Sequence, residues 1–174
     1  MTERPENPKT VAEKPFAEKH YRLASCKLQL FDDQSARVIS NILACQDPWL
    51  RLGYTEDGMF RYLTRTDPSL YRYAVVVSEE TSGVICVRYP WLRGPYLELL
   101  AVFPPHQGKK MGREIMGWMS DECFGVSNNI WTTVSSFNTP ALLFYKNIGF
   151  VEIAELPDLV AGGFSEKLLQ KKCR

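Results

Sequence analysis

The segment 96–112 constrains the fold more than any other part of this chain. An apolar strand pattern over Tyr96–Val102 ends in Phe103-Pro104-Pro105, and a turn of small and polar residues then opens a helix. A second apolar strand pattern follows that helix, over Asn129–Ser135. A strand, a helix and another strand in this order predict a parallel crossover, which needs a sheet with a helix packed against it.

The remaining hydrophobic patterning predicts an α/β domain with a mixed sheet and helices on both faces. The sheet should have six or seven strands, and about four helices should flank it. We expect the further strands over 21–30, 71–78, 84–89, 150–155 and 164–170, and the helices from Asp32 to Asp47-Pro48, from Thr55 to Asp67-Pro68, over 108–123 and over Asn138–Asn147.

The length of 174 residues suits a single domain, which we place at 21–174. Residues 1–20 contain three prolines and eight charged side chains and offer little apolar surface to bury. Ordering such a segment costs more conformational entropy than burial returns, so we predict a flexible N-terminal tail over 1–20.

Composition and charge argue against several classes of protein. The 21 basic and 20 acidic side chains leave a formal charge of +1, whereas a nucleic-acid-binding protein usually has a basic excess. No stretch approaches the roughly 20 apolar residues of a membrane helix, and no membrane partner is expected. The five scattered cysteines form no CxxC pair, which predicts free thiols, a cytoplasmic location and no metal site.

The turn over 107–112 is a candidate phosphate-binding site. Unpaired backbone N–H groups and the dipole at the start of a helix favour an anion, and Lys109 and Lys110 add positive charge. It has neither of the two common phosphate-loop motifs, because the P-loop positions hold Phe103 and Lys110 and only Gly108 and Gly112 fit a dinucleotide fingerprint. The alternative is an ordinary turn with two surface lysines.

Two motifs in this chain resemble those of the GNAT N-acetyltransferases. Leu100-Ala101-Val102-Phe103-Pro104 with Gln107-Gly108-Lys109-Lys110-Met111-Gly112 is similar to motif A, whose pattern is Gln/Arg-x-x-Gly-x-Gly/Ala. The stretch 136–150 matches the family's Asn-x-x-Ala-x-x-x-Tyr-x-x-x-Gly-Phe at every named position. The resemblance covers about 150 residues. One departure is Lys110, which replaces the first glycine of motif A, where a Cβ would hinder approach to a pyrophosphate.

The resemblance implies the GNAT fold, with a mostly antiparallel sheet that splays between its two central parallel strands, and acetyl-CoA as acyl donor. The pyrophosphate would lie on the N–H groups of residues 107–112, and the pantetheine arm would pair with the backbone of Leu100–Val102. The resemblance also assigns cofactor contacts to motif B: Asn138, Ala141 and Phe144. Asn138 should in addition cap the last helix.

The resemblance further implies direct attack of an amine on the thioester. An N–H group at Val102 or Ala101 would stabilise the oxyanion. Tyr145 matches the family's general acid, seven residues after the motif asparagine, and would protonate the leaving thiolate. The alternative role for Tyr145 is that of a core aromatic packed beside Phe144.

The base that deprotonates the amine is not determined by the motifs. Some relatives have a glutamate five residues before the motif asparagine, but this chain has Thr133 there. Glu98 is the candidate instead, acting through a water, because strand alternation would place its side chain on the same face as Val102. The alternative is a structural carboxylate paired with Arg88 or Arg93.

The acceptor pocket is the least defined part of the site. We expect Trp49, Tyr54, Trp91 and Arg93 to contribute to it, although aromatic residues are also common in cores. The predicted function is N-acetylation of a small-molecule or peptide primary amine. The alternatives are a non-catalytic acyl-CoA-binding module and a domain that binds another phosphorylated ligand. The sequence leaves open whether the chain forms a homodimer.

Overall fold

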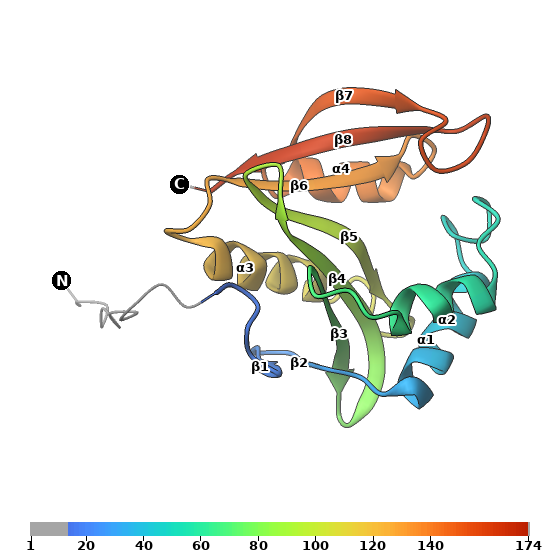
Figure 1. Ribbon diagram of the computed structural model, residues 1–174, viewed down its shortest axis with the longest axis vertical. Coiled ribbons are helices and arrows are strands. Elements are labelled where there is room, and N and C mark those ends of the chain that lie inside the picture. The colour runs from blue at the N-terminus through green and yellow to red at the C-terminus, as the bar shows by residue number, and fades with distance from the viewer. Residues whose placement is uncertain (1–13, 174) are drawn as a thin grey trace.

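The computed structural model describes residues 14–173 and shows one mixed sheet with helices on both faces (Figure 1). The helices are α1 (Asp33–Ala44), α2 (Glu56–Thr64), α3 (Met111–Cys123) and α4 (Thr139–Asn147). The strands are β1 (His20–Arg22), β2 (Lys27–Gln29), β3 (Leu70–Val77), β4 (Glu80–Trp91), β5 (Gly94–Val102), β6 (Asn129–Ser135), β7 (Val151–Pro157) and β8 (Ser165–Lys172). None of these helices has the length and apolar character needed to cross a bilayer.

The strand order across the sheet is β1-β2-β3-β4-β5-β6-β8-β7, and only the β5–β6 pair is parallel. This confirms the predicted crossover from 96 to 135. The ladder between the two parallel strands has only two residue pairs: Tyr96 lies opposite Trp131, and Leu97 lies opposite Thr132. Beyond those pairs β5 continues to Val102 and β6 to Ser135 without a ladder between them, so the sheet is splayed as predicted.

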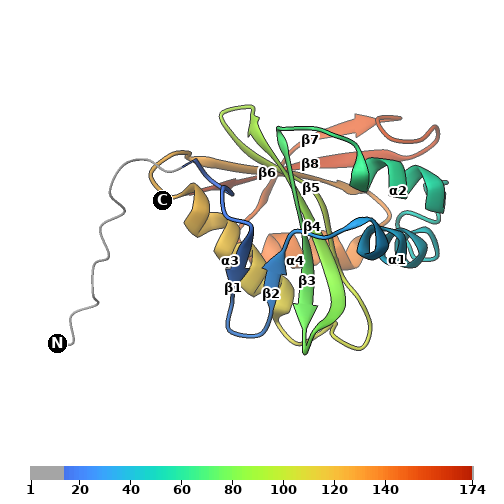
Figure 2. The ribbon, with the colours of Figure 1, turned by 60° about the horizontal axis from the view of Figure 1, so that its bottom comes forward.

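Each face of the sheet has its own apolar core. The α3 and α4 face buries Ile115, Met119 and Tyr145 against β-strand residues such as Ile85 and Leu97. The opposite core holds the buried faces of α1 and α2, which lie beside one another in both views (Figures 1 and 2): Ala36, Ile39, Leu43, Met59 and Leu63. The apolar residues of each helix recur at helical spacing, so that one side of the helix is buried.

The structure has eight strands rather than six or seven, because the segment predicted as one strand over 21–30 is a hairpin. β1 and β2 pair antiparallel, with His20 opposite Gln29. The Leu23 N–H donates to the Cys26 carbonyl at 2.9 Å and closes the turn. The alternation of apolar residues continues through this tight turn, which is why it resembled a single strand.

A second hairpin replaces the predicted connection over 90–95. β4 extends to Trp91 and β5 begins at Gly94, so that only Leu92 and Arg93 form the turn. Both residues have positive φ, 34° and 60°. Positive φ at both central positions is typical of the two-residue turn that matches strand twist.

The predicted tail over 1–20 is not observed at residues 14–20, where the chain packs against the domain. The Phe16 side chain is 1% exposed. Its N–H donates to the Glu122 carboxylate at 3.0 Å, and its carbonyl accepts from the Tyr73 hydroxyl at 2.8 Å. The prediction weighed the prolines and charges of this segment and overlooked one aromatic anchor. Residues 1–13 lie outside the described part of the chain.

Candidate active site

A bulge in β5 lies where this strand separates from β6. Cys86 of β4 pairs with Leu99 and the next residue, Val87, pairs with Leu97, so that Glu98 has no partner on β4. An extra residue in one strand shifts the alternation of side chains beyond it. The prediction that Glu98 and Val102 share a face is therefore wrong. Glu98 reaches Tyr62 of α2, whereas Val102 packs against the core under α3 and α4.

The splayed edge of β5 presents backbone groups that no strand pairs. The Phe103 N–H donates to the Ser82 carbonyl at 2.8 Å, which directs it toward β4. Because N–H groups alternate along a strand, those of Val102 and Leu100 point the other way, into the gap beside β6. The Ala101 N–H points toward β4. The gap therefore offers a strand-like edge to an extended ligand.

The turn that follows β5 leads to the uncapped start of α3. Lys110 is the N-cap residue, and its side chain makes no capping hydrogen bond. The first N–H groups of α3 thus have no side-chain acceptor, which suits an anion. The Gln107 side chain donates to the Val102 carbonyl at 2.8 Å, and a Cβ on Gly112 would lie 3.3 Å from the Phe144 ring. The turn therefore lies against both the β5 edge and α4.

Lys110 keeps the backbone conformation that the motif glycine would favour. Its φ is +64°, in the left-handed region that is costly for residues with a Cβ. We expect Lys110→Gly to raise the free energy of unfolding by about 0.5–1 kcal/mol, as the relieved strain exceeds the entropy cost of glycine.

Chemical denaturation of the purified protein measures this change. Lys109→Gly is the matched control, since it removes the same charge at a residue without positive φ and should give no gain in stability. Equal effects of the two substitutions would contradict the assignment of backbone strain to Lys110.

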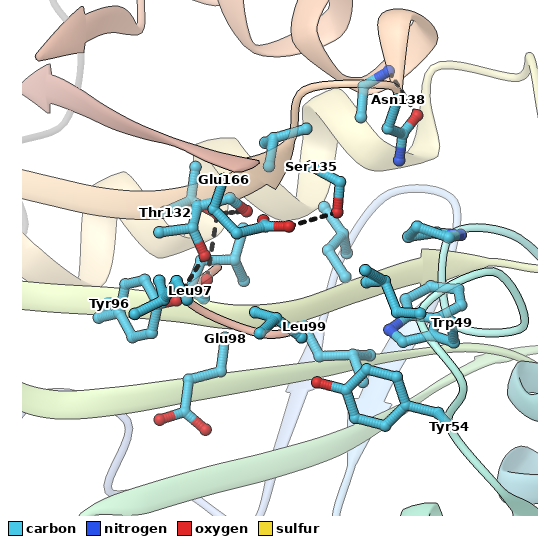
Figure 3. A pocket seen from close by; sticks show the side chains of 18 of the residues that line it. Trp49, Tyr54, Tyr96, Leu97, Glu98, Leu99, Thr132, Ser135, Asn138 and Glu166 are labelled. Atoms are coloured by element: carbon cyan, nitrogen blue, oxygen red, sulfur yellow. Dashed lines mark hydrogen bonds between the residues drawn. The ribbon is translucent and has the colours of Figure 1, made fainter. Parts of the chain in front are cut away.

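A cavity of about 430 Å³ opens beside the splay (Figure 3). Its wall combines the α1–α2 connection, β5, β6, α4, the β7–β8 loop and β8. The structure brings together seven of the residues that the sequence predicted for the site: Trp49, Tyr54, Glu98, Leu100, Asn138, Ala141 and Tyr145. Segments that are far apart in the chain thus meet at one cavity.

Tyr145 lines this cavity from α4 and is only 7% exposed. Its ring lies between those of Phe144 and Phe150, at centroid distances of 5.0 and 5.2 Å. Burial raises the pKa of the Tyr145 phenol above its ordinary value, while a hydrogen bond with Thr132 acts in the opposite direction. The phenol is therefore held in its protonated form, as a proton donor must be. Tyr145 therefore packs as a core aromatic beside Phe144 and also lines the cavity, so the two roles considered for it are compatible.

Asn138 caps α4 from the cavity wall. Its side-chain oxygen accepts from the Ala141 N–H at 3.2 Å. Since this bond uses only the oxygen, the amide NH₂ group remains available to a ligand in the cavity.

Glu98 is engaged by two partners. One of its oxygens accepts from the Arg88 guanidinium, and the other accepts from the Tyr62 hydroxyl at 2.9 Å. Arg88 also donates to Asp67 at 3.0 Å and to Ser69 at 2.6 Å. Glu98 thus forms the ion pair that was the alternative to a role as base, and its partner is Arg88 rather than Arg93.

Trp91 and Arg93 do not line the cavity. The Trp91 ring packs on Tyr96 and Trp131, at 4.7 and 5.8 Å between centroids. The Arg93 carbonyl accepts from the Ser127 hydroxyl at 2.9 Å. Because these residues belong to the tight β4–β5 hairpin, they lie at its turn rather than in a loop over the acceptor pocket.

Glu166 is a cavity residue that the sequence analysis missed. It projects from β8, is 4% exposed, and accepts a 2.5 Å hydrogen bond from the Ser135 hydroxyl. Burial raises the pKa of the Glu166 carboxyl above its ordinary value, which the Ser135 bond partly offsets. A signal that could have found it is the acidic residue within the strand predicted over 164–170, although the adjacent Lys167 is typical of a solvent-facing strand.

Thr133 occupies the position at which some relatives have a glutamate. Its hydroxyl lies 2.7 Å from that of Tyr96 across the β5–β6 pair. A hydroxyl in this position orients Tyr96 in the wall of the cavity but cannot act as a carboxylate base. Within residues 14–173, no group of three or more His, Cys, Asp or Glu side chains could hold a metal ion.

Comparison with known proteins agrees with this architecture. The sequence model of the Acetyltransferase (GNAT) family matches residues 36–150, more than half of the chain. No curated protein matches the chain.

Solved structures share the fold at low identity. An acetyltransferase from Thermus thermophilus is 18% identical, with a TM-score of 0.70 over 87% of this chain and 99% of its own. A spermidine N-acetyltransferase from Vibrio cholerae, in complex with CoA and spermine, is also 18% identical, with a TM-score of 0.65 over 86% of this chain and 96% of its own.

Three observations identify the family of this chain. They are the match to the family model, the splay between the two parallel strands, and the two motifs beside one cavity. The match spans motif A, motif B and both strands of the splay. The same elements carry the uncapped α3 terminus and the cavity wall. This chain is a member of the GNAT acetyltransferase family.

Proposed function

We propose that this protein transfers the acetyl group of acetyl-CoA to a primary amine by direct attack. The observation that carries the proposal is the position of Tyr145, whose protonated phenol lines the cavity into which the free edge of β5 opens. A thioester paired with that edge would have its carbonyl within the cavity. The family match supports the same reaction class.

The residues present fit acetyl-CoA as a cosubstrate. The uncapped N–H groups over 107–112 and the two lysines there would hold the pyrophosphate. The edge of β5 from Leu100 to Val102 would pair with the pantetheine arm, replacing the Gln107 hydrogen bond to the Val102 carbonyl. Asn138, Ala141 and Phe144 would complete the contacts from α4.

Two groups would stabilise the transition state. Of the two N–H donors that the resemblance implies, that of Val102 points into the gap and that of Ala101 does not, so we assign the oxyanion to Val102. Tyr145 would give its proton to the leaving thiolate. Because burial keeps this phenol protonated, it has a proton to give as negative charge develops on the leaving sulfur.

The acceptor is an amine that reaches the cavity between the α1–α2 connection and β8. The complex of the Vibrio cholerae neighbour with CoA and spermine supports a small-molecule amine over a peptide.

Free-thiol release from acetyl-CoA in the presence of a panel of primary amines tests this function. We expect turnover with at least one amine, and a rise in Tm on addition of CoA. The alternative is a non-catalytic acyl-CoA-binding module, which the pairing of Glu98 with Arg88 favours. Binding of CoA without acetyl transfer to any amine would establish that alternative. Absence of CoA binding would reject both.

A further inference from the structure

The ionisable side chains that line the cavity are all acidic or phenolic. Glu98 and Glu166 are present, whereas no Lys, Arg or His side chain is among the lining residues. The Arg88 guanidinium balances the charge of Glu98. Glu166 has no ion-pair partner among the described residues, so its carboxylate is the uncompensated charge of the cavity.

Glu166 is directed into the cavity by its neighbours. It pairs in register with Ser135 at the end of β6, where that strand has already left β5. Figure 3 shows Glu166 reaching Ser135, while the Glu98 carboxylate points away on the other side of β5. The two carboxylates are therefore not a pair and have different surroundings.

Aromatic side chains line the same cavity as Glu166, from other elements of the wall. Tyr54 and Tyr96 line the cavity together with both carboxylates. Burial raises the pKa of each of the two phenols, and the negative charges of Glu166 and Glu98 act in the same direction. Trp49 lines the same cavity. Aromatic faces attract cations and also cover apolar groups, so this wall suits an organic cation rather than a hydrated one.

We propose that Glu166 binds the ammonium group of the acceptor and takes one of its protons, and that the acceptor is a monoamine with an aromatic or aliphatic body and no carboxylate beside the amine. This inference rests on the acetyl transfer proposed above. It assigns to β8 the amine-binding and base function that the sequence analysis sought on β5.

The protons balance in this scheme. The ammonium loses one proton to Glu166, which later releases it to solvent, and the nitrogen lone pair then forms the bond to the thioester carbon. The carbon–sulfur bond breaks and the thiolate takes the phenolic proton of Tyr145. The second proton lost by the nitrogen restores that phenol. The products are the acetamide, the free thiol of CoA and one proton.

The charge of the cavity excludes acceptors that carry a carboxylate next to the amine. Such a group would lie against Glu166 with no cationic side chain in the cavity to balance it. Like charges brought together away from bulk water repel strongly. Amino acids should therefore be poor acceptors compared with the amines that lack only their carboxylate.

The test compares kcat/KM for matched pairs: phenethylamine with L-phenylalanine, tyramine with L-tyrosine, and isopentylamine with L-leucine. For the best pair we expect a preference of about 100-fold or more for the amine that lacks a carboxylate. Glu166→Gln keeps the size of the side chain and should lower kcat/KM for that amine about 100-fold while the CoA-dependent rise in Tm is unchanged. It should also reduce the preference between the pair at least tenfold, which loss of folding alone would not do.

Two variants separate this role from structural effects. Glu155→Gln makes the same substitution on the exposed β7 side of the hairpin, where Glu155 pairs with Lys167, and should leave kcat/KM unchanged. Ser135→Ala removes the hydrogen bond but keeps the Glu166 carboxylate, so it should preserve the preference for the amine that lacks a carboxylate.

Several outcomes would overturn the inference while leaving the reaction intact. Two of them concern the acceptor: equal kcat/KM for amines and amino acids, and transfer only to peptide amines or only to diamines. The other two concern the variants: an unchanged preference for the amine over the amino acid in Glu166→Gln, and loss of that preference in Glu98→Gln instead. Binding of CoA with no transfer to any amine would instead overturn the proposed reaction, and this inference with it.

Discussion

Tyr145→Phe is expected to lower kcat for acetyl transfer about 100-fold or more, with little change in the affinity for CoA. The substitution removes only the phenolic oxygen, so the ring keeps its contacts with Phe144 and Phe150. If the phenol protonates the leaving thiolate, its loss acts in the transition state and leaves binding of the ground state unaffected. Steady-state rates and a CoA titration of Tm measure the two quantities.

The matched control is Tyr71→Phe, outside the cavity. The Tyr71 hydroxyl is buried and makes no hydrogen bond to the described residues, so its removal should leave kcat unchanged and the stability equal or slightly higher. Full activity of Tyr145→Phe would reject the acid role. A parallel loss of CoA affinity would show that the hydroxyl serves in binding.

The same phenol sets an expectation for the pH dependence of kcat. Burial raises the pKa of Tyr145 above its ordinary value near 10, so the protonated, active form of the acid persists as the pH rises. Activity should therefore show no fall attributable to Tyr145 between about pH 8 and pH 10. A decline with a midpoint in this range that is absent from Tyr145→Phe would contradict the assignment.

Phe16→Ala is expected to lower the free energy of unfolding by about 3–5 kcal/mol. Phe16 packs against three aromatic rings, with centroids 5.6 Å from Tyr71, 6.1 Å from Tyr89 and 5.5 Å from Trp118. Truncation would leave a cavity at the junction of the N-terminal segment, the sheet and α3, and neighbouring side chains could fill it only in part.

Urea unfolding followed by tryptophan fluorescence measures this loss. Phe124→Ala is the control, since that side chain is 72% exposed and its truncation should change stability by less than about 0.5 kcal/mol. A loss below about 1 kcal/mol for Phe16→Ala would mean that residues 14–20 contribute little to the fold, as the predicted tail would.

The element order and the motif positions could be predicted because they depend on local patterns. Asn138 was predicted to cap the last helix, and its side chain accepts the expected hydrogen bond from the Ala141 N–H. A helix was also predicted to begin at Asp32, whose carboxylate accepts from the Ser35 N–H. The helical spacing of the apolar residues in α1 and α3 likewise matches the faces that are buried. These features need only neighbouring residues and the geometry of a helix.

The site residues that were misplaced depend on contacts between distant strands. The face of Glu98 was predicted from strict alternation, but the register between β4 and β5 introduces a bulge at that residue. Glu166 resembles a surface carboxylate until β8 pairs with β6 and brings it to Ser135. No local pattern specifies which strand lies beside another, or where pairing ends.

The amino-acid sequence by itself thus determined the family, the order of helices and strands, the position of the turn between β5 and α3, and the tyrosine of motif B, because each is encoded within a few consecutive residues. Only the tertiary structure decided which carboxylate remains uncompensated in the cavity and which N–H of β5 faces the splay. Those properties arise from the register of β4 on β5, the single parallel pair and the place of β8 beside β6. Burial and charge compensation belong to the assembled environment of a side chain, and that environment exists only once these strands have paired.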